Sequence, residues 1–149
     1  MRVLAENKKA LFDYEILEKF QAGIVLTGQE VKSIKSGRIN LRSSFVIIKK
    51  EEVFLIGASV PPYQPKNAPG DYNPEKSRKL LLQKKEIKKI IGRAHQKGLT
   101  MMPLKVYTDK GKIKVEFAVV RGKKKVDKRE KIKRRETERE IKRALKKEQ

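Results

Sequence analysis

The sequence predicts a mainly β protein: a small antiparallel sheet that closes into a barrel, two or three flanking helices, and a basic C-terminal tail. Three observations support this fold. Segments rich in β-branched and aromatic residues occur in pairs joined by short turns, which is the pattern of hairpins. No helix of crossover length separates the members of a pair, so an antiparallel sheet is favoured over a parallel one. Finally, the density of positive charge rises sharply near residue 121, which marks the tail.

The first predicted strand lies within residues 12–20, where apolar and acidic side chains partly alternate. The next three residues, Gln-Ala-Gly, predict a turn. A short helix is then predicted over residues 28–36, because Thr27 can cap its first turn and Glu30, three residues later, completes a capping box. Gly37 suits the left-handed position that ends such a helix.

Two hairpins and a second helix follow. Residues 44–50 and 53–60 predict the first hairpin, and alternating apolar residues within 104–119 predict the second, around Asp-Lys-Gly. Residues 61–74 hold five prolines and predict a loop. Apolar side chains recur at helical spacing within residues 83–97, and the glycine that follows ends the pattern. The expected total is five or six strands and two or three helices.

Composition limits the classes of function. The 149 residues hold 39 Lys+Arg against 18 Asp+Glu, a formal net charge of +21, for which a polyanionic partner is the simplest explanation. The absence of cysteine excludes disulfides and thiolate metal sites, and the single His95 excludes a cage of several histidines. No apolar segment suits a signal peptide or a membrane span, so we expect no membrane contact and a cytoplasmic location.

The tail differs in composition from the rest of the chain. Residues 121–149 carry 15 Lys+Arg and 6 Asp+Glu, and their few large apolar residues form no stripe that could dock on a core. Acidic and basic residues at i,i+4 spacing support a helix only weakly. We therefore expect an RNA-binding domain over residues 1–121 and a basic tail over residues 122–149, disordered alone and helical when bound along RNA.

Nothing in the sequence favours catalysis. Phosphate-cradling, dinucleotide-binding and nucleophile-elbow motifs are missing. The acids Asp13, Glu15 and Glu18 could hold Mg²⁺, but a solvated strand face is the better interpretation, and His95 fits packing at a helix border. We expect no enzyme activity, no cofactor and no metal. A ribosomal or ribosome-assembly protein and an RNA-processing enzyme are the competing hypotheses.

Basic side chains are the candidate binding groups, because each can neutralise an RNA phosphate and release counterions. Any single lysine is better explained as a solvated surface residue, whereas the whole set is not. Tyrosines could add stacking platforms. The basic groups are Lys8-Lys9, Lys32 with Lys35, Arg78-Lys79, Lys84-Lys85, Lys88-Lys89 and Lys123-Lys124-Lys125, and the tyrosines are Tyr14, Tyr63, Tyr72 and Tyr107.

Five motifs in order resemble the SmpB family, and together they are far more specific than any one alone. They cover the chain from about residue 7 to residue 130. The motifs are Asn7-Lys8-Lys9-Ala10 followed by Asp13-Tyr14, AGIVLTGQEVKSIKSGRINL over 22–41, RKLLLQKKEI over 78–87, MPLKVY over 102–107 and RGKKKVDKRE over 121–130.

The resemblance implies an OB-like antiparallel β-barrel that binds the tRNA-like domain of tmRNA (SsrA RNA). It further implies delivery of alanyl-tmRNA to stalled ribosomes for trans-translation, with the tail probing the vacant mRNA channel beside the small-subunit decoding centre. Alanyl-tRNA synthetase and elongation factor Tu would then be met through tmRNA. Free in solution, the protein is expected to be a monomer.

Carried over position by position, the resemblance also names residues. Two alternatives stay open: Leu81 could be core, and Gly23 and Gly28 could matter only for backbone shape. Body contacts with RNA are implied for Asn7, Lys8, Lys9, Tyr14, Gly23, Lys32, Leu81 and Lys114, to which the basic pattern adds Arg78 and Lys79. Ribosome contacts of the tail are expected for Gly122, Lys123, Lys124, Lys125, Asp127, Lys128, Arg129, Lys131, Lys133 and Arg134.

The sequence departs from the family pattern at several positions. Phe12 replaces a polar residue, Gln21 a common glutamate, and Gln83 a histidine. Tyr72-Asn73-Pro74 stands where the family has an NHDP motif, so the loop over residues 61–74 is the region where the resemblance transfers least. Val126 replaces an aromatic residue or histidine before Asp-Lys-Arg, which favours phosphate contacts over base stacking there.

Overall fold

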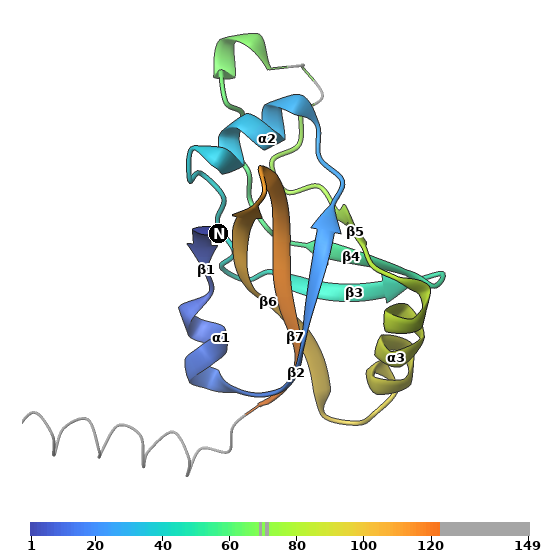
Figure 1. Ribbon diagram of the computed structural model, residues 1–149. Helices are drawn as coiled ribbons and strands as arrows, with labels where there is room; N and C mark the ends of the chain where they lie inside the picture. Colours follow the sequence, from blue (N-terminus) through green and yellow to red (C-terminus); the bar gives the residue numbers. More distant parts are fainter. Residues whose placement is uncertain (69, 71, 123–149) are drawn as a thin grey trace, which may run out of the picture.

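The computed structural model describes residues 1–68, 70 and 72–122 (Figure 1). Within them, seven strands and three α-helices follow one another along the chain. In order, the elements are β1 (Arg2–Glu6), α1 (Lys8–Asp13), β2 (Tyr14–Ile24), α2 (Gly28–Lys35), β3 (Phe45–Lys49), β4 (Glu52–Ile56), the 3₁₀ turn η1 (Pro65–Asn67), β5 (Arg78–Leu81), α3 (Lys84–Ala94), β6 (Leu99–Asp109) and β7 (Lys112–Gly122).

The strands form one antiparallel sheet whose order returns on itself. Neighbouring strands run β1-β6-β3-β4-β5-β2-β7, and β7 pairs again with β6. The pairings therefore pass from β6 through β3, β4, β5, β2 and β7 back to β6. Two joints in this ring are narrow: β3 meets β6 at one pair, Val46 and Met101, and β2 meets β5 at two. The predicted antiparallel sheet with flanking helices is confirmed.

The N-terminal part differs from the prediction. Neither β1 nor α1 was expected, and β1 raises the number of strands above the expected five or six. The predicted turn at 21–23 is wrong, because β2 continues through it with Ala22 opposite Val115 and Gly23 opposite Lys114. Ala22 is buried in the core. Pairing on both edges of β2 and this burial outweighed the local turn signal of the glycine.

Both predicted hairpins are confirmed, and their turns have the same geometry. In the β3–β4 hairpin, Lys50 and Glu51 have φ of 51° and 62°; in the β6–β7 hairpin, Lys110 and Gly111 have φ of 51° and 78°. Positive φ at both central residues is the twist that a two-residue turn needs to match right-twisted strands. The first hairpin achieves it without glycine.

A buried ion pair ties α2 to the chain leading into β5. The capping box is confirmed: the Thr27 N–H donates to Glu30 Oε1 over 2.9 Å, and the Glu30 N–H donates to Thr27 Oγ1 over 3.3 Å. The other carboxylate oxygen of Glu30 accepts from Arg78 Nε, and both side chains are fully buried. Arg78 also donates to the carbonyls of Ala58 and Pro74 over 2.9 and 2.8 Å. We call these groups the Glu30 hub.

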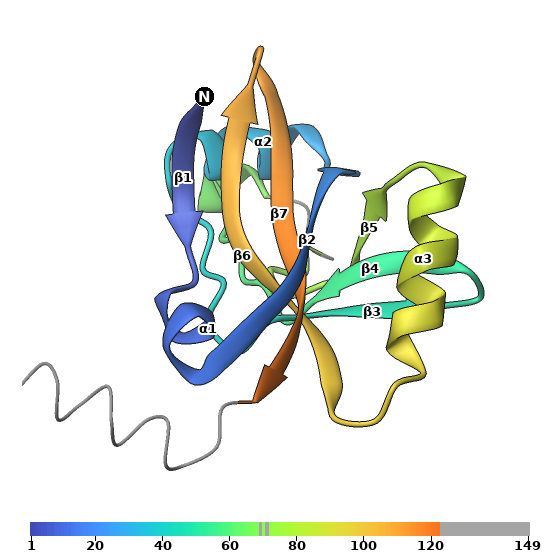
Figure 2. The same ribbon diagram turned by 60° about the horizontal axis from the view of Figure 1, so that its bottom comes forward.

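Helix α3 lies on the opposite side of the sheet from α1 (Figure 2). It begins after Gln83, which forms a capping box with Glu86, and it ends at Ala94 rather than at residue 97. Ile90 buries its apolar face. On its outer side, Lys89 and Arg93 form ion pairs with Glu18 of β2, and Arg93 Nε lies 3.6 Å from Glu18 Oε2. Glu18 therefore anchors the helix instead of forming part of a solvated acidic face.

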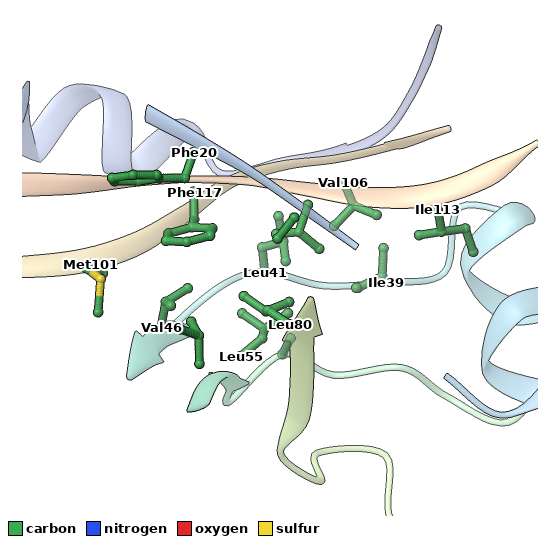
Figure 3. Packing of buried hydrophobic residues seen from close by; sticks show 14 of the residues in the cluster. Phe20, Ile39, Leu41, Val46, Leu55, Leu80, Met101, Val106, Ile113 and Phe117 are labelled. Carbon is green, nitrogen blue, oxygen red and sulfur yellow. The ribbon is translucent and has the colours of Figure 1, made fainter. Parts of the chain in front are cut away.

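Two apolar clusters hold the sheet together. The larger lies inside the ring of strands, where Phe20 and Phe117 stack with ring centroids 5.5 Å apart above Leu41, Leu55 and neighbouring aliphatic side chains (Figure 3). The smaller lies under α1, where Ala10 packs with side chains of β6 and β7. The alternating residues of the long strands thus bury side chains on both faces in this region.

We expect Gly57→Ala to destabilise the fold by at least about 1–2 kcal/mol. Gly57 has φ of +76°, and a Cβ there would lie 2.8 Å from the Ser43 carbonyl oxygen. Gly92→Ala is the matched control, because no atom lies within 4 Å of its added Cβ on α3, and alanine in a helix gains about 0.5–1 kcal/mol over glycine. Urea unfolding measures both; equal stability of the two variants would contradict the close approach.

Candidate nucleic-acid interface

One hollow of about 330 Å³ brings together three of the predicted RNA-binding residues. Gly23 of β2 is paired with Leu81 of β5 on one side and with Lys114 of β7 on the other. We call this hollow the hairpin groove, because residues of the β6–β7 hairpin tip and of α2 line it; the two elements lie at the same end of the molecule in Figure 1. Its lining residues are Gly23, Ile24, Leu26, Val31, Lys35, Leu81, Gly111, Lys112, Ile113 and Lys114.

The chemistry of the hairpin groove suits a nucleic acid. Leu81 is 51% exposed, so the alternative that it is a core residue is wrong. It lines the groove with other apolar side chains, which we call its apolar floor, and Lys35, Lys112 and Lys114 line the same groove. An apolar floor can pack against a ribose or a base, while the surrounding ammonium groups neutralise phosphates. Lys32 is exposed one turn before Lys35 on α2 but does not line the groove.

A second hollow, of about 710 Å³, gathers the predicted N-terminal residues. Lys8 and Lys9 are exposed at the start of α1, and Tyr14 lies half-buried at the start of β2. We call it the N-terminal hollow. Its lining residues are Glu6, Asn7, Lys8, Lys9, Tyr14, Asn40, Arg42, Ser43, Phe45 and Met102. Phe45 and Arg42 were not among the predicted residues, although an aromatic residue beside an arginine in Leu-Arg-Ser-Ser-Phe was a usable signal.

Asn7 has a structural role that its motif did not reveal. Its side chain is buried, its Nδ2 donates to the Pro103 carbonyl over 3.0 Å, and its Oδ1 accepts from the Ala10 N–H over 3.3 Å. These bonds cap α1 and fix it to β6. Asn7 therefore holds α1 against β6, and because it also lines the N-terminal hollow, its expected RNA contact stays a prediction.

The adjacent residues Arg78 and Lys79 point in opposite directions, as neighbours on a strand do. Arg78 is 1% exposed and its guanidinium is bound within the Glu30 hub. The expectation that it contacts RNA is therefore wrong in this structure, since no phosphate can reach it. Lys79 is exposed and lies 3.3 Å from Glu52 across the sheet surface, so it stays a candidate contact.

A polar network crosses the outer face of β6, β7 and β2 beside the hairpin groove. Tyr107 donates to Gln21 Oε1, and Gln21 Nε2 donates to Glu116 Oε2 over 2.9 Å. Lys19 and Lys105 lie 3.7 and 3.5 Å from the same carboxylate. Burial, and after it the negative charge of Glu116, raises the pKa of the Tyr107 phenol. Tyr107 thus serves the network and is not a stacking platform.

The other tyrosines divide between exposed and engaged positions. The Tyr72 hydroxyl donates to the Val60 carbonyl over 2.8 Å, which fixes the proline-rich loop instead of leaving the ring free. Tyr63 is 38% exposed, with the Arg38 guanidinium 6.0 Å from its ring centroid. Of the two loop tyrosines predicted as stacking platforms, Tyr63 is exposed and Tyr72 is half-buried.

The body ends where the tail begins. Gly122 is exposed and is paired with Tyr14, so the tail leaves the sheet beside the N-terminal hollow. The predicted tail residues from Lys123 to Arg134, including Asp127, lie outside the described residues.

Among the residues that are described, no group of three or more His, Asp or Glu side chains could hold a metal ion. His95 caps the end of α3 and is exposed. No helix in that part of the chain is long and apolar enough to cross a membrane.

Comparison with known proteins decides the family. The sequence profile of the SmpB protein family matches residues 4–147. The chain belongs to the SmpB family. It is 51% identical over 145 residues to an SsrA-binding protein of Syntrophobacter fumaroxidans, covering 97% of this chain and 89% of that one. It is 49% identical over 145 residues to the SsrA-binding protein of Acaryochloris marina, covering 97% and 94%.

A solved SmpB structure shares the fold. The structure is described as "tmRNA-SmpB: a journey to the center of the bacterial ribosome", and its matching chain superimposes with a TM-score of 0.68 at 41% identity. The match covers 84% of the present chain and 87% of the other. The departures from the SmpB pattern have local roles: Gln21 joins the Tyr107 network, Gln83 caps α3, and Phe12 is half-buried in α1. Val126 lies outside the described residues.

Proposed function

We propose that this SmpB family member binds tmRNA through the hairpin groove and acts with it on the ribosome in trans-translation. The observation that carries the proposal is the near-full-length identity of about one half to SsrA-binding proteins. The groove supplies a suitable surface, since three residues named by the resemblance line it together with apolar side chains and lysines. The surrounding candidates are Lys32 and Lys79.

The remaining steps of the proposal concern the division of labour along the chain. Residues 1–121 form the body that holds the tRNA-like domain, and residues 122–149 form a tail that becomes helical in the vacant mRNA channel beside the decoding centre. The complex would deliver alanyl-tmRNA to stalled ribosomes without any catalytic step by the protein. Such a task belongs in the cytoplasm, where ribosomes work.

The tmRNA contact is tested with two groove variants and a charge-matched control. Leu81→Ala should weaken tmRNA binding by about tenfold, the equivalent of about 1.4 kcal/mol, because the apolar floor loses its largest exposed side chain. Lys112→Ala with Lys114→Ala should lower the slope of log K against log salt by about 0.7–0.9 for each phosphate that is no longer neutralised. Gel shifts against tRNA and ribosomal RNA competitors supply both values.

Lys49→Ala with Lys97→Ala removes the same charge from exposed positions that neither line the groove nor belong to the candidate binding groups. This control should leave the affinity within about twofold and the slope nearly unchanged. If the control and the groove variant behave alike, the groove is not the tmRNA site. If the unaltered protein shows no preference for tmRNA over the competitors, the proposed function itself fails.

A further inference from the structure

A third hollow, of about 310 Å³, lies where the sheet opens between β3 and β6. The two strands meet at one pair, Val46 with Met101, and two positions further on Ile48 and Leu99 are no longer paired. In Figure 2 the strands run apart from their crossing, on the side of the molecule that holds α3. We call this hollow the β3 cleft. It is lined by β3, the C-terminal end of α3, the first residues of β6 and Val119 of β7.

The β3 cleft is mainly apolar and has a few polar groups. Eight of its eleven lining residues are apolar, and the others are Arg93, His95 and Thr100, so none of these described residues is acidic. Ile47 is 36% exposed there, although a large aliphatic side chain is usually buried. The volume lies at the lower end of the range of about 300–1,000 Å³ that is typical of ligand pockets. The cleft therefore suits an apolar group with a negatively charged neighbour.

The backbone of β3 presents an open edge to this cleft. Lys49 and Glu52 flank the two-residue turn, so they exchange hydrogen bonds across the β3–β4 hairpin. Because bonding alternates along an antiparallel strand, the N–H and C=O of Ile48 point to the opposite edge. Among the described residues, no strand pairs with Ile48 on that edge. Residues 46–48 are all β-branched and carry no charge, proline or bulge, the usual protections of an open edge.

Positive charge surrounds the cleft. The Arg93 side chain is 39% exposed in spite of its ion pair with β2. Lys49 continues β3 beyond the cleft, Lys97 lies just before β6, and both are exposed. Glu52, the acid across the hairpin from Lys49, is already in an ion pair with Lys79. A segment that brings carboxylates to this edge is therefore favoured by charge complementarity.

Charge and backbone chemistry also separate the candidate occupants. A second copy of this chain would bring a net charge of +21 to a basic surface, and residues 123–149, with 14 basic and 6 acidic residues, would likewise add positive charge. RNA carries the complementary charge but has no amide backbone with which to extend a sheet. An acidic polypeptide satisfies both the open edge and the cations.

We propose that the β3 cleft docks an extended acidic segment of a partner protein. The segment adds a strand to the edge of β3 at Ile48, places an apolar side chain in the cleft and sets carboxylates beside Arg93 and Lys49. In this mode of recognition the main-chain hydrogen bonds supply affinity and the pocket supplies specificity. The inference goes beyond the proposed function, because the cleft shares no lining residue with the hairpin groove and can be filled while tmRNA is bound.

The test uses the full-length protein and a short fluorescent peptide in which glutamate alternates with valine, at about 0.15 M salt to screen general attraction. Binding of the peptide should slow hydrogen exchange at the Ile48 N–H. An N-methylated peptide keeps the charge and the side chains but cannot pair with a strand, and it should bind at least about tenfold more weakly. A peptide with lysine in place of glutamate should not bind.

Two variants test the cleft itself. Ile47→Ala removes exposed apolar surface and Arg93→Gln removes a cation, and each should weaken peptide binding by about threefold or more. Lys85→Gln is the matched control for Arg93→Gln, because Lys85 is exposed on the same helix but lies outside the cleft. It should leave peptide binding unchanged. All three variants should bind tmRNA within about twofold of the unaltered protein.

Each alternative occupant gives a different result. Equal binding of the N-methylated peptide, or unchanged exchange at Ile48, would overturn strand addition. Displacement of the peptide by tmRNA would assign the cleft to RNA, and a dimer that Ile47→Ala disrupts would assign it to a second copy. Equal binding of the lysine peptide would remove the charge argument against the basic tail. Each of these results overturns the inference, and the tmRNA affinity measured alongside tests the proposed function separately.

Discussion

Arg78→Ala is expected to lower the free energy of unfolding by about 3–5 kcal/mol, the usual result of removing one partner of a buried ion pair. Glu30, which has no exposed surface, would keep Lys76 as its remaining cationic partner, and the carbonyls of Ala58 and Pro74 would lose their Arg78 donor. The free energy of unfolding of a single domain is only about 5–15 kcal/mol, so the expected loss is a large fraction of the total stability.

The adjacent residue is the control for this prediction. Lys79→Ala removes an equal charge from the next position of β5, but its ion pair with Glu52 is exposed on both sides. Exposed pairs contribute about 0–1 kcal/mol. Urea unfolding of the two variants should therefore separate them clearly. A difference below about 1 kcal/mol would mean that the Glu30 hub does not hold α2 to the loop before β5.

The hub also predicts how stability depends on pH. Burial alone would raise the pKa of the Glu30 carboxyl, but the Thr27 N–H, Arg78 and Lys76 together hold that pKa below its ordinary value. The folded state then binds fewer protons than the unfolded state, so this contribution is complete above the ordinary carboxyl pKa and is lost as the pH falls through the lowered one. The difference in free energy of unfolding between the unaltered protein and Arg78→Ala should therefore be smaller at about pH 3.5 than at about pH 7, as measured by urea unfolding at both pH values.

Local signals in the sequence predicted the regular elements well. The capping box at Thr27 and Glu30, and the alternating strands around Lys110 and Gly111, depend on residues within a few positions of one another. The prediction failed where long-range pairing decided the outcome. Gly23 indicated a turn locally, yet pairing with β5 and β7 holds it in the middle of the sheet.

The candidate site shows the same limit. From the sequence, Arg78 and Lys79 are equally good candidates for phosphate contacts. Only the fold shows that Arg78 is buried against Glu30, 48 positions earlier in the chain. Asn7 likewise owes its role to Pro103, a residue distant in sequence. Conversely, Gly23, Leu81 and Lys114 were named at three separate positions of the resemblance, and the register of three strands brings them into one groove.

The body without the tail should keep its affinity for tmRNA but lose peptide tagging. A chain ending at Gly122 retains every described strand, because β7 ends there in its pairing with Tyr14. The hairpin groove lies at the other end of β7 and should not change. At raised salt, where the general attraction of the basic tail is screened, the tmRNA affinity should stay within about threefold of that of the full chain.

Tagging, in contrast, should fall to background in a reconstituted system with ribosomes stalled on a truncated mRNA, since nothing would occupy the vacant channel. A full-length chain with Asp127, Lys128 and Arg129 changed to alanine keeps the length of the tail and should lose most tagging for the same reason. Joint loss of tmRNA affinity and tagging on truncation would refute the two-part division. The division is physically reasonable because 14 of the 39 basic residues lie in residues 123–149, beyond the strand that completes the sheet. Basic side chains at these positions can bind a second RNA without occupying the surface of the body that binds tmRNA.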